Sequence, residues 1–438
     1  MSPIRPLPAL AGLTLAAVLC GCDRGLDESA DPPDLNAAAR EYVVLVLAMG
    51  EHDPNYVDAY YGPDSLRDVA RQRGLSLAGI RDAALELAER AAAAPPAPDD
   101  ALLSLRGPFL EKQLRAVAAR ADMMLGRTFS FDQETAALYD AISAPRDQAY
   151  FDRTLAEIDD LLPGEGPLPQ RTGQFRDQFI IPPERLAAVF DAAIEACRQR
   201  TLDHLSLPGN ERFTVEYVTD QPWGGYNWYQ GDGNSLIQVN TDLPIYIDRA
   251  VDLGCHEAYP GHHTLMSLVE SRLVRGRGWI EFSVYPLFSP ISLIAEGTAN
   301  YGTEIAFPGE SRVRFEREVL FPLAGLDAAA ADDYYELQAL RARLTYAGNE
   351  AARAYLEGRM DRQQASDYLV RNQLVTPEAA GKKVDFIDRY RGYVINYNVG
   401  RDLVRAYIER EAGDDPERRW AVFVELISSP RLPSDLVE

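Results

Sequence analysis

Hydrophobic and polar residues alternate with helical spacing over most of the chain after about residue 37. Apolar positions recur every three or four residues, as in an amphipathic helix, and segments rich in proline and glycine, at 95–98 and 163–167, interrupt the pattern. We therefore predict helices over 76–93, 101–125, 148–162 and 183–205.

The pattern changes in the middle of the chain. Residues 213–218 alternate and are rich in β-branched and aromatic side chains, which predicts a strand, and 235–240 predicts a second one. The glycine and aromatic residues of 223–234 predict a long connecting loop, with a lid as the alternative. A helix is expected to follow the second strand.

Helical spacing then returns. One helix is predicted over about 327–357, ended by Gly358 in the C′ position. Asp361 is placed to cap the next helix, and Thr376 followed by Pro377 begins another that runs to Tyr390 or beyond. The predicted fold class is mainly α, with a small β-sheet beside the helix that follows the second strand.

The first 22 residues have the composition of a secretory signal: a basic start, a short apolar segment and small residues before a cleavage point. The ending Leu19-Cys20-Gly21-Cys22 resembles a bacterial lipobox, which implies cleavage before Cys22 and lipid attachment to its thiol. We expect a signal peptide at 1–21, a polar tether at 22–36 and one helical domain at 37–438. This places the chain at the periplasmic face of a bacterial membrane, in contact with lipid through the anchor only.

The charge balance excludes one class of partner. The 438 residues carry a formal net charge of −23, and a chain so acidic repels phosphate backbones, so nucleic-acid binding is not expected. Once Cys22 is lipidated and Cys20 removed, two cysteines remain. Two cysteines do not make a disulfide framework, and we expect Cys197 and Cys255 to be buried packing residues.

The histidines are concentrated in one motif. Three of the five in the chain fall within His256-Glu257-Ala258-Tyr259-Pro260-Gly261-His262-His263, with a glutamate directly after the first. Neutral imidazole is the commonest protein ligand for zinc. The motif therefore predicts a zinc site, and His52 and His204 are expected to be non-ligands.

The spacing of the motif departs from the His-Glu-x-x-His zinc helix, because Pro260 occupies the i+4 position. In a straight helix His262 would lie about 240° round the axis from His256, and His263 about 10 Å along it. Proline and glycine can bulge the helix by two residues. We prefer His262 as the second ligand, with His263 as the alternative and otherwise a residue that contacts substrate or supports the ligands.

Two histidines leave a catalytic zinc site one ligand short. Glu296 is the preferred third ligand, because the small residues Gly297, Ala299 and Gly302 that follow it would let its helix pack closely on the motif helix. Glu304 and Glu270 are weaker alternatives.

Glu257 would act as the general base that takes the proton of the attacking water and passes it to the leaving amine. A phenol or guanidinium would be needed to stabilise the oxyanion. The candidates near the C-terminus are Tyr390, Arg391, Tyr393, Tyr397 and Arg401.

The strand at 235–240 could pair with an extended peptide or be purely structural. Together with His263 and Arg401, Asn240 at the end of this strand is a candidate for contact with substrate.

The motif, together with Glu296-Gly297-Thr298-Ala299-Asn300-Tyr301, Tyr397-Asn398-Val399-Gly400 and Arg106-Gly107-Pro108-Phe109-Leu110, resembles the bacterial domain-of-unknown-function 885 family. The resemblance implies a large, clefted, helical zincin-like domain and a peptidase or carboxypeptidase role. It also implies zinc held by His256, His262 and Glu296, Glu257 as the base and Tyr397 as the oxyanion donor. Thr298 and Thr303 depart from residues that many relatives carry, so substrate preference is expected to differ.

These observations favour a zinc-dependent hydrolase of peptide bonds in short peptides, either a carboxypeptidase or an oligopeptidase. One alternative is a hydrolase of non-peptide amides, which the same residues would serve. The other is a non-catalytic zinc-containing lipoprotein that binds peptides, against which the position of Glu257 argues.

Overall fold

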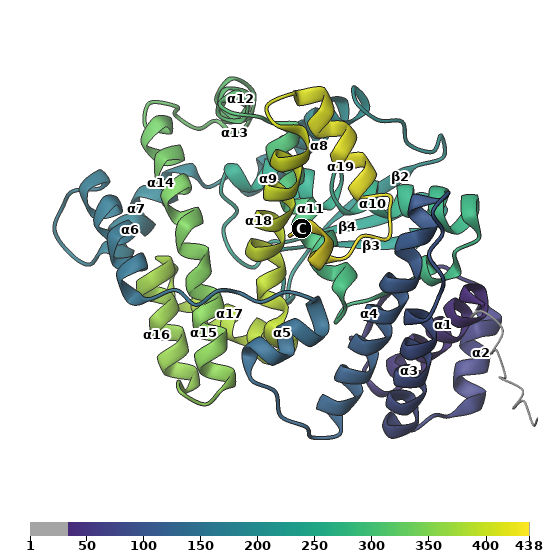
Figure 1. Ribbon diagram of the computed structural model, residues 1–438. Helices are drawn as coiled ribbons and strands as arrows, with labels where there is room; N and C mark the ends of the chain where they lie inside the picture. The colour runs from purple at the N-terminus through teal and green to yellow at the C-terminus, as the bar shows by residue number, and fades with distance from the viewer. Residues whose placement is uncertain (1–33, 438) are drawn as a thin grey trace, which may run out of the picture. The chain divides into compact units, whose positions relative to one another are not determined.

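A computed structural model describes residues 34–437 (Figure 1). The predicted signal peptide, the lipid-bearing Cys22 and most of the predicted tether lie outside the described residues. The first helix begins at Leu35, inside the range predicted for the tether. Within 34–437, no helix is both long enough and apolar enough to cross a membrane.

Eight helices and one short strand precede the sheet. The four predicted helices of this region are confirmed as α3, α4, α6 and α8, the last preceded by a 3₁₀ turn at Pro183–Arg185. The elements are α1 (Leu35–His52), β1 (Val57–Tyr60), α2 (Asp64–Arg73), α3 (Leu77–Ala92), α4 (Ala101–Met124), α5 (Phe131–Tyr139), α6 (Gln148–Leu161), α7 (Leu168–Arg176) and α8 (Leu186–Leu202).

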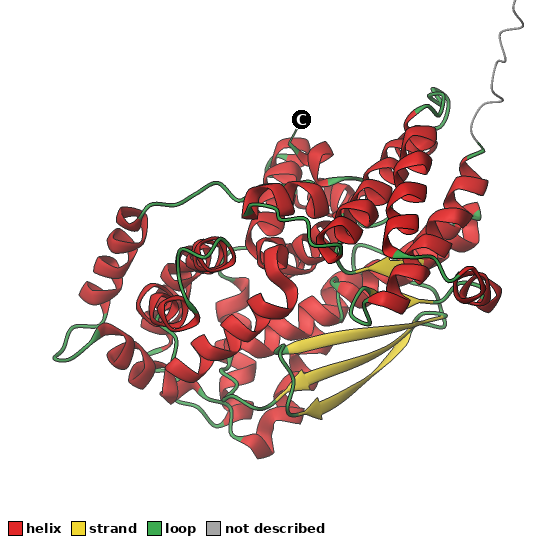
Figure 2. Cartoon of the chain, turned by 90° about the horizontal axis from the view of Figure 1, so that it is seen from below, coloured by secondary structure: helices red, strands yellow, loops and turns green. Residues whose placement is uncertain are grey.

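The sheet has three strands, β2 (Arg212–Val218), β3 (Gly225–Gly231) and β4 (Asn234–Asn240), in the order β2-β4-β3. β4 pairs in parallel with β2 and antiparallel with β3. Figure 2 shows the three strands side by side along the helices. Because β4 is the central strand, both its edges are already paired. Of the two alternatives for 235–240, pairing with a peptide is therefore excluded and the purely structural strand remains.

The prediction of a long loop at 223–234 is also wrong, because Gly225–Gly231 forms β3. Its aromatic side chains favour a strand, and β3 turns into β4 through Asp232-Gly233, both with positive φ (55° and 64°). Asp-Gly in a two-residue turn is a strong hairpin signal, and it was available in the sequence.

The remaining helices confirm most of the expected boundaries. The helix predicted over 327–357 is interrupted by a 3₁₀ turn at Leu344–Tyr346, and Gly358 follows it with φ +72°. Asp361 and Thr376 cap the next two helices. The elements are α9 (Asp248–Glu257), α10 (His262–Val269), β5 (Val284–Pro286), which pairs with β1, α11 (Pro290–Ala306), α12 (Ser311–Phe315), α13 (Phe321–Ala324), α14 (Ala331–Arg343), α15 (Ala347–Leu356), α16 (Arg362–Gln373), α17 (Pro377–Tyr390), α18 (Ile395–Ala412) and α19 (Pro416–Leu426).

Helix α11 is held between α18 and the turn that links α9 to α10. On one side, a Cβ on Gly297 would lie 2.6 Å from the carbonyl carbon of Gly400, so two glycines let α11 and α18 touch. On the other side, Gly302 packs against the ring of Pro260. The expected packing on the motif is therefore made by Gly302, whereas Gly297 serves the contact with α18.

Candidate metal centre

The motif forms two helices and not one bulged helix. α9 ends at Glu257 and α10 begins at His262, with residues 258–261 as the turn between them. A Cβ on Gly261 would lie 1.8 Å from the carbonyl oxygen of His256, a distance that no side chain tolerates. Gly261 has a negative φ of −75°, so the close approach, and not a left-handed backbone, requires glycine here.

The turn brings two imidazoles to one point. His256 Nε2 and His262 Nε2 lie 3.1 Å apart, with their rings at 85°. Asn300 Oδ1 lies 3.2 Å from His256 Nδ1 and can accept a hydrogen bond from its N–H. That tautomer leaves the lone pair of Nε2 directed at the site, as metal-ligating histidines require.

Glu296, on α11, completes a group of three donors. Its Oε2 is 3.3 Å from His256 Nε2, and its Oε1 is 3.8 Å from His262 Nε2. Tetrahedral zinc with ligands at about 2.0–2.2 Å places neighbouring donor atoms about 3.3–3.6 Å apart. Separations of 3.1, 3.3 and 3.8 Å are close to that spacing, so these residues fit zinc. Within 34–437, the buried Oε2 has no hydrogen-bond partner.

Glu257 lies beside these donors, but its carboxylate is farther from His256 than that of Glu296. Its Oε1 is 4.0 Å from His256 Nε2, against 3.3 Å for Glu296. Burial raises the pKa of Glu257 to about 7, against the opposing effect of His256. A carboxyl group that titrates near neutrality can both accept and return a proton.

The pKa values of the two imidazoles are shifted in opposite directions. Burial lowers the pKa of His262 to about 4. Burial also disfavours the charged form of His256, but Glu257 and Glu296 outweigh it and raise its pKa to about 9. The pKa of Glu296 is lowered, because the two histidines outweigh burial there. Imidazoles and carboxylates in this arrangement are a donor set that suits Zn²⁺.

Two tyrosines of the C-terminal region lie near the centre and make different contacts. The hydroxyl of Tyr393 donates to Glu296 Oε1 at 2.8 Å, so it supports the third donor. Tyr397 lines the cavity in front of the centre, and its residue is 38% exposed. Burial, with the charges of Glu296 and Glu257, raises the pKa of Tyr397, so it stays a proton donor.

The other C-terminal candidates are less suited to stabilise the oxyanion. Arg391 donates to Glu134 at 2.7 Å, outside the cavity lining. Arg401 lines the cavity but donates to Asp402. Tyr390 also lines the cavity. None of the three hydrogen-bonds to a donor of the centre.

The two weaker alternatives for the third ligand are engaged elsewhere. Glu304 lines the cavity but pairs with Arg405. Glu270 pairs with Arg275 and accepts from the Tyr229 hydroxyl.

His263 is buried away from the cavity, whereas Asn240 lies at its wall. His263 is 0% exposed, and its nitrogens contact Ser235 Oγ at 2.8 Å and Glu211 Oε2 at 3.0 Å. His263 thus supports the motif from the protein interior, and its complete burial excludes contact with substrate in this conformation. Asn240 lies at the cavity wall, where its amide donates to the carbonyl of Trp223 at 2.8 Å and fastens the segment before β3.

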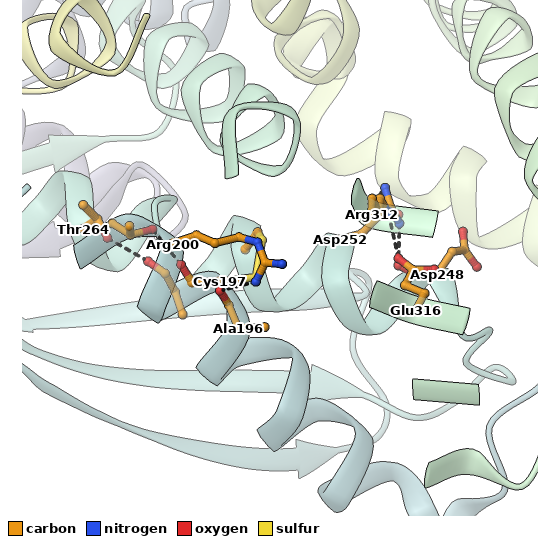
Figure 3. Close-up of a disulfide and its surroundings, with 11 residues drawn as sticks. Ala196, Cys197, Arg200, Asp248, Asp252, Thr264, Arg312 and Glu316 are labelled. Atoms are coloured by element: carbon orange, nitrogen blue, oxygen red, sulfur yellow. Dashed lines mark hydrogen bonds and ion pairs between the residues drawn. A yellow bond between two sulfur atoms is a disulfide. The ribbon is translucent and has the colours of Figure 1, made fainter. Parts of the chain in front are cut away.

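Cys197 and Cys255 form a disulfide that joins α8 to α9, with a sequence separation of 58 residues. The expectation of two unpaired packing residues is therefore wrong. Figure 3 shows this bond near one end of α9, and the cluster of Arg312, Asp252 and Glu316 farther along the helix. At the other end of α9, Arg312 also donates to the carbonyl oxygen of Asp248 at 2.8 Å. α9 is thus fixed at both ends, which holds His256 in place.

The centre opens into a cavity of about 1030 Å³. Asp58, on β1, lines this cavity. It lies close enough to the centre for the charges of Glu296 and Glu257 to affect its pKa. Burial, and then these two carboxylates, raises the pKa of Asp58 to about 8. Nothing in the sequence singles out Asp58, which lies nearly 200 residues before the motif.

The comparisons with known proteins give a fold but no family. No family model and no curated protein matches the chain. An M32 carboxypeptidase from Deinococcus radiodurans R1 is similar in structure, with a TM-score of 0.52 and 13% identity, over 92% of this chain and 94% of that one. A candidate lipoprotein from Colwellia psychrerythraea has a TM-score of 0.51 and 15% identity, over 84% and 70%. The predicted fold class, mainly helical with a small sheet beside the motif helix, is confirmed.

Proposed function

We propose that this chain is a zinc-dependent peptidase that cleaves short peptides, as a carboxypeptidase or an oligopeptidase, and that it belongs to the domain-of-unknown-function 885 family. One observation carries the proposal: His256, His262 and Glu296 present donor atoms at zinc-like spacing, with a second carboxylate, Glu257, beside them. The fold shared with a carboxypeptidase supports it.

When bound, zinc would supply Lewis-acid activation of water and of the scissile carbonyl. His256, His262 and Glu296 would hold the ion, while Asn300 and Tyr393 orient two of these ligands.

Glu257 takes the proton of the attacking water and returns it to the leaving nitrogen. Tyr397 donates its phenolic proton in a hydrogen bond to the oxyanion. Gly225, the first residue of β3, lies so close to α9 that a Cβ there would be 2.9 Å from Glu257 Oε1. Glycine at this position therefore leaves room for the base.

The location follows from the same features. We propose a lipid-anchored protein at the periplasmic face of a bacterial membrane, attached through Cys22. The disulfide between Cys197 and Cys255 supports this, because such bonds persist in oxidising compartments.

The test compares wild type with Glu257→Gln for zinc content and for cleavage of a mixed short-peptide library. We expect one zinc in each protein and loss of cleavage by a factor of about 10²–10⁴ in the variant. Glu304→Gln is the matched control and should retain both zinc and cleavage. Equal cleavage by wild type and Glu257→Gln, or no zinc in either, would refute the proposal; zinc without cleavage of any peptide would favour a binding role.

A further inference from the structure

Cations outnumber acids on the wall of the cavity. Eight lysine and arginine residues line it against six aspartate and glutamate residues, in a chain whose net charge is −23. Five of these cations pair with carboxylates: Arg249, Arg312, Lys382, Arg401 and Arg405. Within 34–437, the remaining three, Arg176, Arg341 and Lys383, have no ion-pair partner.

These three residues come from three helices, α7, α14 and α17. The charge of Arg176 affects the pKa of Arg341, and the charge of Arg341 affects that of Lys383. Lys383 is exposed on the cavity wall, and within the described residues its ammonium has no hydrogen-bond partner. Desolvation, and then the charges of Arg341 and Arg249, lower its pKa to about 8. Arg341 donates to Gln338, but its buried Nε has no acceptor among the described residues. Burial and then the charge of Arg176 lower the pKa of Arg341 to about 10.

Like charges held close together repel one another, and a bound anion relieves that repulsion. The buried Nε of Arg176 also has no acceptor in the described part of the chain, and its guanidinium lies over the ring of Tyr246. The cluster therefore has several donors ready for one acceptor group, and all three residues border the same cavity as the candidate metal centre.

Helix α9 links the cluster to the centre. The charge of Arg249 lowers the pKa of Lys383, and it also lowers the pKa values of His256 and Glu257. Arg249 and His256 are seven positions apart on the helix, which is about 10 Å along the axis. An extended peptide covers this distance with about three residues, so the two sites can hold one short peptide.

We propose that Arg341 and Lys383, with Arg176 behind them, bind a carboxylate of the substrate a few residues from the scissile bond. The inference rests on the proposed peptidase function. The carboxylate can be the free C-terminus of the peptide or an acidic side chain near it, since both present the same two oxygens.

The test measures binding apart from cleavage, in zinc-loaded Glu257→Gln protein at pH 7. Calorimetry would compare tetra-alanine as the free acid, its C-terminal amide, and an amide with glutamate in the last position. We expect the free acid to bind at least about tenfold more tightly than the amide, and Lys383→Met and Arg341→Met each to remove this preference. A factor of ten corresponds to about 1.4 kcal/mol.

Lys382→Met is the matched control, because Lys382 is adjacent but already paired with Asp242 at 2.8 Å. It should keep the preference, and retained zinc and melting temperature would show that each variant is folded. If the glutamate amide binds like the free acid, the cluster also accepts a side-chain carboxylate.

Equal binding of acid and amide, or a preference that both variants keep, would overturn the inference. Neither result depends on turnover. A failure of the peptidase proposal appears separately, as absent cleavage by wild type.

Discussion

Replacing Gly261 by alanine tests whether the turn assembles the metal centre. The added Cβ would lie 1.8 Å from the carbonyl oxygen of His256 and 2.5 Å from that of Cys255. An ordinary carbon–oxygen contact is about 3.3–3.6 Å, so the backbone must move by about 1.5 Å. Both oxygens belong to backbone at the end of α9, which cannot rotate away as a side chain could.

The movement is large compared with what a metal site tolerates. Ligand distances must be held to about 0.2 Å, and residue 261 is directly followed by His262. We expect zinc affinity to fall at least about 100-fold, beyond the 10–100-fold that loss of a supporting contact costs. Overpacking of this kind also lowers the free energy of unfolding by about 1–3 kcal/mol.

The assay is competition for zinc with a chromophoric chelator, with circular dichroism as the check on folding. Gly173→Ala in α7 is the matched control, because a Cβ there meets no atom within 4 Å. It should bind zinc like wild type and be more stable, since alanine is favoured over glycine inside a helix by about 1 kcal/mol. Zinc affinity within about threefold of wild type in a folded Gly261→Ala protein would refute the reasoning.

Further outcomes follow from the same geometry. Replacing both Cys197 and Cys255 by alanine should lower the free energy of unfolding by about 4 kcal/mol, from the entropy of a 58-residue loop; an unchanged denaturation midpoint would contradict this. Tyr393→Phe should weaken zinc affinity by about 10–100-fold, because Glu296 loses its donor, and wild-type affinity in the chelator assay would exclude that role. Tyr397→Phe should lower kcat by about 10²–10³ with zinc retained, and an unaltered kcat would remove it as the oxyanion donor. The pKa of Lys383 is about 8, lowered by desolvation and then by Arg341 and Arg249, so its charge is present below that pH and lost above it. The ratio of kcat/KM for a free-acid peptide to that for its amide should therefore fall as pH rises through 8, and Lys383→Met should flatten the profile.

The sequence by itself determined the helical class and predicted most residues of the candidate metal centre. Amphipathic spacing and capping residues are local signals, so α3, α4 and α6 could be placed to within a residue or two. The motif histidines are also local, and the geometry of proline and glycine was enough to prefer His262. The Asp232-Gly233 hairpin was equally local and was missed because the glycines and aromatics around it resemble a loop.

Only the tertiary structure decided which distant groups meet. The disulfide joins cysteines 58 residues apart, and Tyr393 reaches Glu296 from 97 residues away. Asp58 and Lys383 border the cavity from opposite ends of the chain. Helical periodicity shows which face of a segment is buried but not which other segment covers it, because that choice depends on packing between elements that are distant in sequence.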